Sequence, residues 1–101
     1  MAIDQALASG KPVLLDLGAS SCDPCKRMAP ILEVVSAEVK GRATIIFVDI
    51  IKERRIGERF DVRMMPTQVF FNSNGKEVKR HYGYMDRAEI LQALQSAGLR
   101  G

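Results

Sequence analysis

The fold is decided in residues 12–30, which read PVLLDLGASSCDPCKRMAP. The first six form an apolar run that contains one acid, Asp16, and turn-forming residues bound it, which is the pattern of a buried strand. The small, polar residues 18–21 then predict a loop. Pro24 suits the first turn of a helix, where no backbone N–H is needed. The stretch therefore predicts a strand, a loop and the start of a long helix, with two cysteines at the junction.

The apolar positions that follow define this helix. They recur at helical spacing and form one apolar face, which consists of Met28, Ile31, Leu32, Val35 and Val39. Pro30 falls inside the helix and is expected to kink it, because a proline cannot donate the backbone hydrogen bond of an interior turn. Gly41 is expected to end it.

The rest of the chain alternates between apolar strands and short helices. We expect helices at residues 2–9, 52–60 and after Asp86, a second buried strand at 43–48, a third strand at 67–71 and a returning strand at 77–82. Asn74-Gly75 is a tight-turn signal that makes the last two strands a hairpin. Asp86 and Glu89 predict a capping box. A right-handed crossover makes the first two strands parallel, so we predict an α/β fold with a four-stranded mixed sheet flanked by helices.

Composition narrows the classes of function. The 101 residues fit a single domain, 1–101. The chain has 15 Lys and Arg against 12 Asp and Glu, no Trp and no long basic stripe, which argues against nucleic-acid binding. No run reaches the roughly 20 apolar residues of a membrane span, and no signal peptide opens the chain. We expect a soluble monomer, cytoplasmic as written, or periplasmic or otherwise extracytoplasmic if this is an excised mature domain with an added Met1.

Both cysteines lie in one four-residue window, Cys22-Asp23-Pro24-Cys25, so they brace little of the chain. Cys22 is predicted at the helix N-terminus, where unpaired N–H groups and the macrodipole favour a thiolate. Cys25 is one turn inside the helix and less exposed. A pair at this spacing in a β-α-β context indicates redox chemistry, with Cys22 as attacking nucleophile and Cys25 as resolving thiol.

Other readings of the cysteines stay open. A structural zinc site needs about four ligands, and two Cys and one His cannot close one alone. A metal shared between two copies remains an alternative, as does an inert pair. We expect no cofactor or metal beyond the redox-active disulfide itself. The single histidine, His81, is interpreted as a surface residue and not as an acid–base group.

Two further features point to the same site. Asp16 is a carboxylate in an apolar strand, and burial beneath Cys25 would raise its pKa and let it accept the proton of that thiol. Pro66 opens the third strand, a position at which a strand tolerates proline. A cis bond there would leave the backbone of Met65 free to pair with an extended substrate. Met64 and Met65 are either exposed contacts beside the thiols or core residues.

The residues of the predicted site resemble those of thioredoxins. The stretches concerned are Leu15-Asp16-Leu17, Cys22-Asp23-Pro24-Cys25-Lys26, Met28-Ala29-Pro30-Ile31-Leu32, Met65-Pro66-Thr67, the hairpin turn 71–75 and Gly83. The resemblance runs from about Lys11 to Leu99. It implies the thioredoxin fold, a cis bond before Pro66, Asp16 as the buried acid and Pro30 as the helix kink. It also implies dithiol–disulfide exchange with disulfide-containing protein substrates, for which an upstream protein donor supplies the electrons.

The chain departs from the family at several places. Ser21 and Gly18 stand where thioredoxins usually carry Trp, Asp23 replaces a glycine between the cysteines, and Phe47 stands where a lysine usually pairs with the buried acid. The usual first strand is absent ahead of the first helix. We therefore expect the protein partners and the reduction potential of this chain to differ from those of other thioredoxins.

The leading hypothesis is a protein-disulfide reductase. Its catalytic residues are Cys22, Cys25 and Asp16, its substrate-binding residues are Met65, Pro66, Thr67 and Ser21, and its redox-tuning residues are Asp23, Pro24 and Lys26. The carboxylate of Asp23 disfavours a thiolate on Cys22, which predicts a reducing pair. The alternative is a non-catalytic module that binds peptides in the groove at Met65-Pro66.

Overall fold

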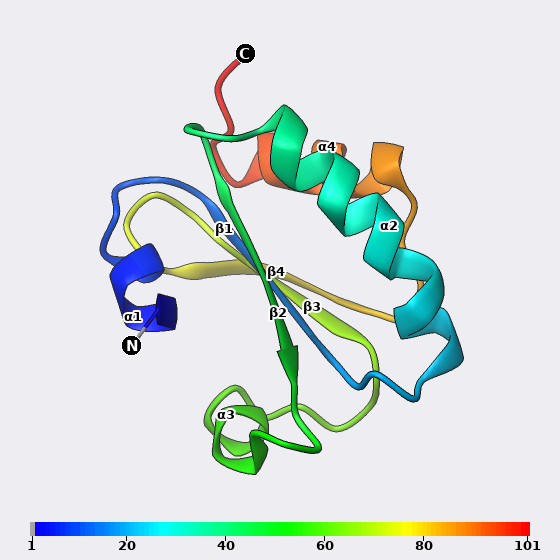
Figure 1. Ribbon diagram of the computed structural model, residues 1–101. Helices are drawn as coiled ribbons and strands as arrows, with labels where there is room; N and C mark the ends of the chain where they lie inside the picture. Colours follow the sequence, from blue (N-terminus) through cyan, green and yellow to red (C-terminus); the bar gives the residue numbers. More distant parts are fainter. Residues whose placement is uncertain (1) are drawn as a thin grey trace.

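The computed structural model describes residues 2–101. Met1 lies outside the described residues, and so does the prediction that it could be an added residue. The elements follow the predicted order (Figure 1). They are α1 (Ala2–Leu7), β1 (Val13–Gly18), α2 (Asp23–Glu38), β2 (Thr44–Asp49), α3 (Arg54–Arg59), β3 (Thr67–Phe71), β4 (Glu77–Tyr82) and α4 (Arg87–Ser96). The strands form one sheet in the order β2-β1-β3-β4. β1 pairs parallel with β2 and antiparallel with β3, and β3 pairs antiparallel with β4, so the predicted mixed sheet is confirmed.

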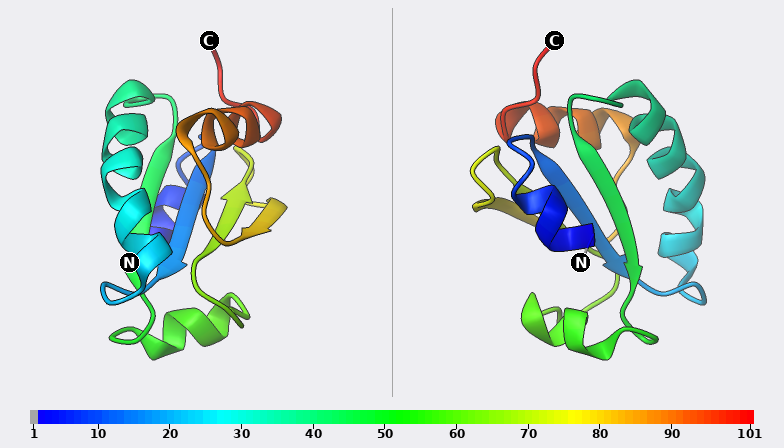
Figure 2. Two further views of the ribbon diagram at one scale, coloured as in Figure 1. Left: turned by 90° about the vertical axis from the view of Figure 1, so that its right-hand side faces the viewer. Right: turned by 60° about the vertical axis from the view of Figure 1, so that its left-hand side comes forward.

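Helices pack against both faces of the sheet (Figures 1 and 2). Leu14 and Phe70 point to the face covered by α2 and α4, where they join one apolar cluster. Leu15 and Val69 point to the opposite face and pack with residues of α1 and α3 in a second cluster. Successive side chains of a strand alternate between faces, and β1 is central, so all six of its residues are buried. This double burial is why β1 is almost entirely apolar.

The expectation that the second strand is buried is wrong. β2 lies at the edge of the sheet, and Val48 is its only buried residue. Phe47 keeps 44% of its surface exposed. The Ile- and Val-rich pattern of this strand does not reveal its place in the sheet, because strand order depends on which neighbour each strand finds after folding.

The predicted starts of α2 and α4 are confirmed, whereas α2 ends at Glu38, a few residues before the predicted Gly41. Cys22 is the N-cap of α2, and Pro30 lies inside this helix on its exposed side. Asp86 caps α4, and both hydrogen bonds of its capping box with Glu89 are present. Between residues 2 and 101, the helices are too short or too polar to cross a membrane.

Candidate active site

The site is built around the two cysteines at the start of α2, which form a disulfide with their Cα atoms 5.2 Å apart. Cys22 is partly exposed, whereas Cys25 keeps only 4% of its surface accessible. The backbone N–H of Cys25 donates a hydrogen bond to Sγ of Cys22 at 3.3 Å. A sulfur at a helix N-cap that also accepts an N–H bond is placed to carry negative charge. The more accessible sulfur is therefore the one whose thiolate the helix stabilises.

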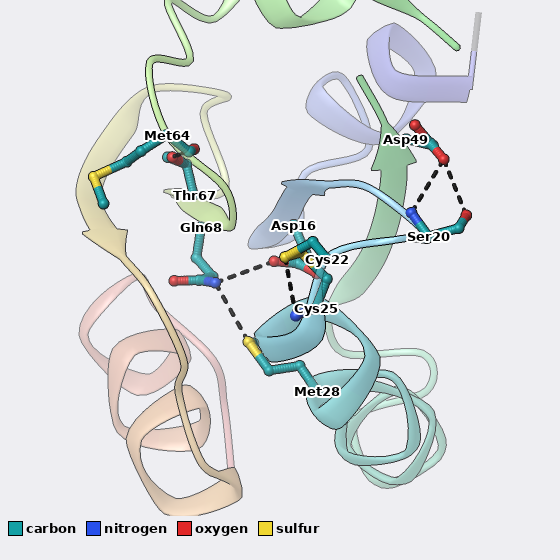
Figure 3. The surroundings of a disulfide bond; sticks show 9 residues. All are labelled: Asp16, Ser20, Cys22, Cys25, Met28, Asp49, Met64, Thr67 and Gln68. Carbon is teal, nitrogen blue, oxygen red and sulfur yellow. Dashed lines mark hydrogen bonds between the residues drawn. A yellow bond between two sulfur atoms is a disulfide. The ribbon is translucent and has the colours of Figure 1, made fainter. Parts of the chain in front are cut away.

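The loop before Cys22 is held by an acid that the sequence analysis did not single out, Asp49 at the end of β2. Its Oδ2 accepts hydrogen bonds from the backbone N–H and the hydroxyl of Ser20 at 3.2 and 3.0 Å (Figure 3). Its Oδ1 accepts from the N–H of Ile51 at 2.9 Å and of Lys52 at 3.3 Å. Burial raises the pKa of Asp49, but the hydrogen bonds from Ser20, Lys52 and Ile51 outweigh it and hold the pKa below its usual range. The sequence did contain a signal for Asp49, because this acid directly follows the predicted second strand. The carboxyl ends of parallel strands meet at one edge of a sheet, so an acid at that place lies near the loop after β1.

Asp16 is fully buried in β1. Its Oδ1 accepts a hydrogen bond from Nε2 of Gln68 at 3.1 Å, while its Oδ2 has no partner among the described residues (Figure 3). Burial raises the pKa of Asp16 to about 6, and the Gln68 hydrogen bond lowers it in part. The side chain thus combines a high proton affinity with one free oxygen.

The first turn of α2 lies over Asp16. The Sδ of Met28, three residues after Cys25, is 3.5 Å from the same Gln68 nitrogen. Gly18, two residues after Asp16 on the same face of β1, approaches the buried cysteine so closely that an added Cβ would stand 2.6 Å from Sγ of Cys25. Because Gly18 has no side chain, the backbone of β1 can lie directly against the sulfur of Cys25.

The peptide bond between Met65 and Pro66 is cis. Pro66 is buried, and the hydroxyl of Thr67 donates to the carbonyl of Met64 at 2.7 Å. Met64 and Met65 keep 51% and 37% of their surfaces exposed, so both lie on the surface and neither is a core residue. Thr67 pairs with Leu17, which brings the start of β3 next to the end of β1 and its cysteine loop. Within residues 2–101, the backbone N–H and C=O of Met65 have no hydrogen-bond partner.

The remaining predicted residues lie around the disulfide. Ser21, Asp23 and Lys26 are exposed, and Pro24 occupies the first turn of α2. Phe47 pairs with Asp16 in the β1–β2 ladder, so an aromatic ring takes the place of a cation beside the acid. With Ile45 and residues of α2 it lines a surface pocket of about 480 Å³ that reaches Cys25.

His81, interpreted from the sequence as a surface residue, also contacts a buried side chain. The ring is half-buried, and its Nδ1 lies 2.7 Å from Oε1 of Gln68. Gln68 was not singled out either, although a polar residue inside the apolar strand at 67–71 was a visible signal. Elsewhere, residues 2–101 contain no cluster of three or more His, Cys, Asp or Glu side chains arranged to hold a metal ion.

An accessible helix-capping sulfur bonded to a buried partner one turn further on is the arrangement of a dithiol–disulfide exchange site. Residues 2–96 match the family model of thioredoxin, so the chain belongs to the thioredoxin family. Members exchange dithiols with disulfides without an added cofactor, because the redox group is the cysteine pair of the chain itself. The chain is thus a thiol–disulfide oxidoreductase domain of the thioredoxin type.

Individual relatives agree with this assignment. A thioredoxin from Mycolicibacterium smegmatis is 39% identical over 93 residues, which cover 90% of this chain and 82% of the relative. A bifunctional thioredoxin reductase/thioredoxin from Mycobacterium leprae is 36% identical over 88 residues, or 87% of this chain, and the chain spans 19% of that relative's length. A mutant thioredoxin from Halobacterium salinarum, 23% identical, has the same fold, with a TM-score of 0.85 over 98% of this chain and 85% of that one.

Replacing Asp16 tests the cost of its burial. Because the folded pKa of about 6 lies above the ordinary value of 3.8, folding favours the protonated carboxyl. Stability is then full below pH 4 and declines as the pH rises through 6. Asp16→Asn should remove this decline and raise the free energy of unfolding at pH 8 by about 3 kcal/mol relative to the wild type. Urea denaturation at pH 4 and pH 8 measures the difference; an equal effect of the substitution at both pH values would contradict it.

Adding a methyl group at position 18 tests the close approach to Cys25. In Gly18→Ala the new Cβ presses on the sulfur while it is held in the disulfide, whereas a free thiol can rotate away. Overpacking typically costs about 1–3 kcal/mol, so the reduction potential should become about 20–60 mV more oxidising. Equilibration with glutathione measures it. Gly101→Ala is the control, since an added Cβ there meets nothing within 4 Å. An unchanged or more reducing Gly18→Ala protein would refute the contact.

Proposed function

We propose that this chain reduces disulfide bonds of other proteins, with Cys22 as the attacking thiolate and Cys25 as the resolving thiol. The observation that carries the proposal is the asymmetry of the pair: one sulfur is accessible and caps a helix, and the other is buried one turn further on. An attacking sulfur must be reached by the substrate, whereas a resolving sulfur must be reached only by its neighbour.

The reaction takes place in two exchanges. The thiolate of Cys22 attacks one sulfur of a substrate disulfide and forms a mixed disulfide, and the other substrate sulfur leaves as a thiolate that takes up a proton. Cys25 then loses its proton and attacks Sγ of Cys22, which releases the second substrate thiolate. Two electrons pass to the substrate, and the Cys22–Cys25 disulfide remains.

Asp16 is proposed to accept the proton of Cys25 in the second exchange. Its free Oδ2 and its raised pKa of about 6 suit a base that must bind a proton near neutral pH and later release it. Gly18, on the same face of β1, places this part of the strand against the Cys25 sulfur. Cys25 keeps only 4% of its surface accessible, which favours a proton acceptor inside the protein over one in bulk solvent.

The substrate chain is proposed to bind along Met65, Pro66 and Thr67, with Ser21 on the opposite side of the disulfide. The unpaired backbone groups of Met65 can bond an extended peptide as an added strand would. The exposed Met64 and Met65 side chains supply adaptable apolar contacts. This surface imposes little sequence specificity, because backbone groups provide most of the recognition.

The partners follow from the chemistry. Each turnover leaves the disulfide, so an upstream protein donor must reduce it again. The Mycobacterium leprae relative is by its name both a thioredoxin reductase and a thioredoxin, which supports a reductase-type donor for this chain. We propose that residues 1–101 act as a single domain and a monomer, because the proposed site is complete within the one chain.

Separate serine substitutions of the two cysteines test the proposal. Cys22→Ser should reduce insulin disulfides no faster than buffer with dithiothreitol alone. Cys25→Ser should still attack but stall as a mixed disulfide, visible by non-reducing mass spectrometry as one added substrate mass. A peptide-binding module without redox activity predicts equal insulin reduction by wild type and Cys22→Ser, and that result would overturn the proposal.

The redox-tuning role of Asp23, Pro24 and Lys26 is tested at Asp23. Its carboxylate is exposed in the first turn of α2 beside Cys22. Asp23→Asn removes a negative charge that opposes the thiolate, so the pKa of Cys22 should fall by about half a pH unit and the potential should become more oxidising. The rate of alkylation by iodoacetamide against pH measures the pKa. Glu33→Gln, further along the same helix, is the charge-matched control. Equal effects of both substitutions would contradict the local influence of Asp23.

A further inference from the structure

Three polar side chains cross the middle of the sheet in one row. Asp16 of β1 pairs with Gln68 of β3, and Gln68 pairs with His81 of β4. The amide of Gln68 joins the other two: its Nε2 lies 3.1 Å from Oδ1 of Asp16, and its Oε1 lies 2.7 Å from Nδ1 of His81. Asp16 and Gln68 are fully buried, while His81 is half-buried at the end of the row.

Hydrogen-bond chemistry allows one orientation of this row when Asp16 is ionised. A carboxylate only accepts hydrogen bonds, so the amide of Gln68 must present its NH₂ group to Asp16. Its carbonyl oxygen then faces His81, and Nδ1 of that ring must carry a proton. Nδ1 is a donor both in the neutral Nδ1–H tautomer and in the protonated ring, so the contact survives either state.

We propose that His81 is a positioning residue for the exchange reaction: its Nδ1–H holds the Gln68 amide with the NH₂ group toward Oδ1 of Asp16, and so leaves Oδ2 as the oxygen that takes the proton of Cys25. The role of Oδ2 rests on the function proposed above for Asp16. The orientation of the amide does not, because it follows from the three side chains alone.

The surroundings give no other group this task. The second neighbour of the Gln68 nitrogen is Sδ of Met28 at 3.5 Å, a weak acceptor that cannot hold the carbonyl end of the amide (Figure 3). Burial and the Gln68 hydrogen bond are the two influences on the pKa of Asp16, and no charged side chain among the described residues adds to them. Lys79, on the same face of β4 as His81, is exposed. Without His81, the buried Oε1 of Gln68 loses its partner, and only the hydrogen bond to Asp16 still holds the amide.

A double-mutant cycle on the pKa of Asp16 tests this inference. ¹³C NMR follows the carboxyl through a pH titration of the oxidised protein, in wild type, Gln68→Met, His81→Phe and the double variant. Gln68→Met should raise the proton affinity of Asp16 about tenfold, because it removes a hydrogen bond to the charged form. His81→Phe should raise it by about twofold or more, and it should add nothing in the Gln68→Met background, since His81 acts only through Gln68.

Two controls sharpen the cycle. His81→Gln restores an N–H donor and should return the titration toward that of the wild type, while Tyr82→Phe, an exposed neighbour on the same strand, should leave it unchanged. An unchanged Asp16 titration in His81→Phe, or an effect that persists without Gln68, would overturn the inference.

A second measurement needs no substitution. ¹⁵N NMR of wild-type protein, at a pH at which the ring is neutral, should show Nδ1 of His81 protonated; an Nε2–H tautomer would refute the proposed orientation. Both readouts are independent of thiol activity. If Asp16→Asn leaves insulin reduction intact, the role of Asp16 fails, while the amide orientation is judged by the NMR results alone.

Discussion

The parallel pairing of β1 with β2 is the constraint on which the site depends. Two parallel neighbours require a crossover, and here α2 makes it, so the loop after β1 must deliver the start of a helix to the carboxyl edge of the sheet. Cys22 stands at that helix start, and Asp49 ends the neighbouring strand at the same edge. The position of the disulfide is therefore a consequence of topology, and the Asp49 hydrogen bonds to Ser20 hold its loop in place.

The same arrangement forces an acid into the core. β1 is buried on both faces, so Asp16 cannot avoid desolvation, and its pKa rises to about 6. A side chain that served stability alone would be apolar here. The polar row through Gln68 to His81 offsets part of this cost, because it supplies one hydrogen bond to the carboxylate, whereas the unpartnered Oδ2 adds to the cost.

Local sequence signals predicted the helices and strands well, but they did not predict which side chains meet across neighbouring strands. The apolar run before the cysteines, the N-cap position of Cys22 and the capping box at Asp86 each depend on residues a few positions apart, and the structure has all three. The edge position of β2 was missed because its composition resembles that of a central strand. The partners Asp16 and Gln68 are 52 residues apart and meet only through the register of β1 with β3. The apolar strand around Asp16 and the family resemblance both pointed to this acid, but the resemblance carried no information on Gln68 or His81.

The reduction potential of the Cys22–Cys25 pair tests the proposed reaction most directly. In the proposed reaction, the two thiols act as one two-electron couple and give electrons to protein disulfides. Equilibration of the purified chain with a series of glutathione or dithiothreitol buffers, read by mass spectrometry after alkylation, measures that couple. We expect a single transition closer to the value typical of thioredoxins, about −270 mV, than to that of strong disulfide oxidants, about −120 mV. A potential near the oxidising value would contradict it, as would cysteines that fail to titrate as one pair.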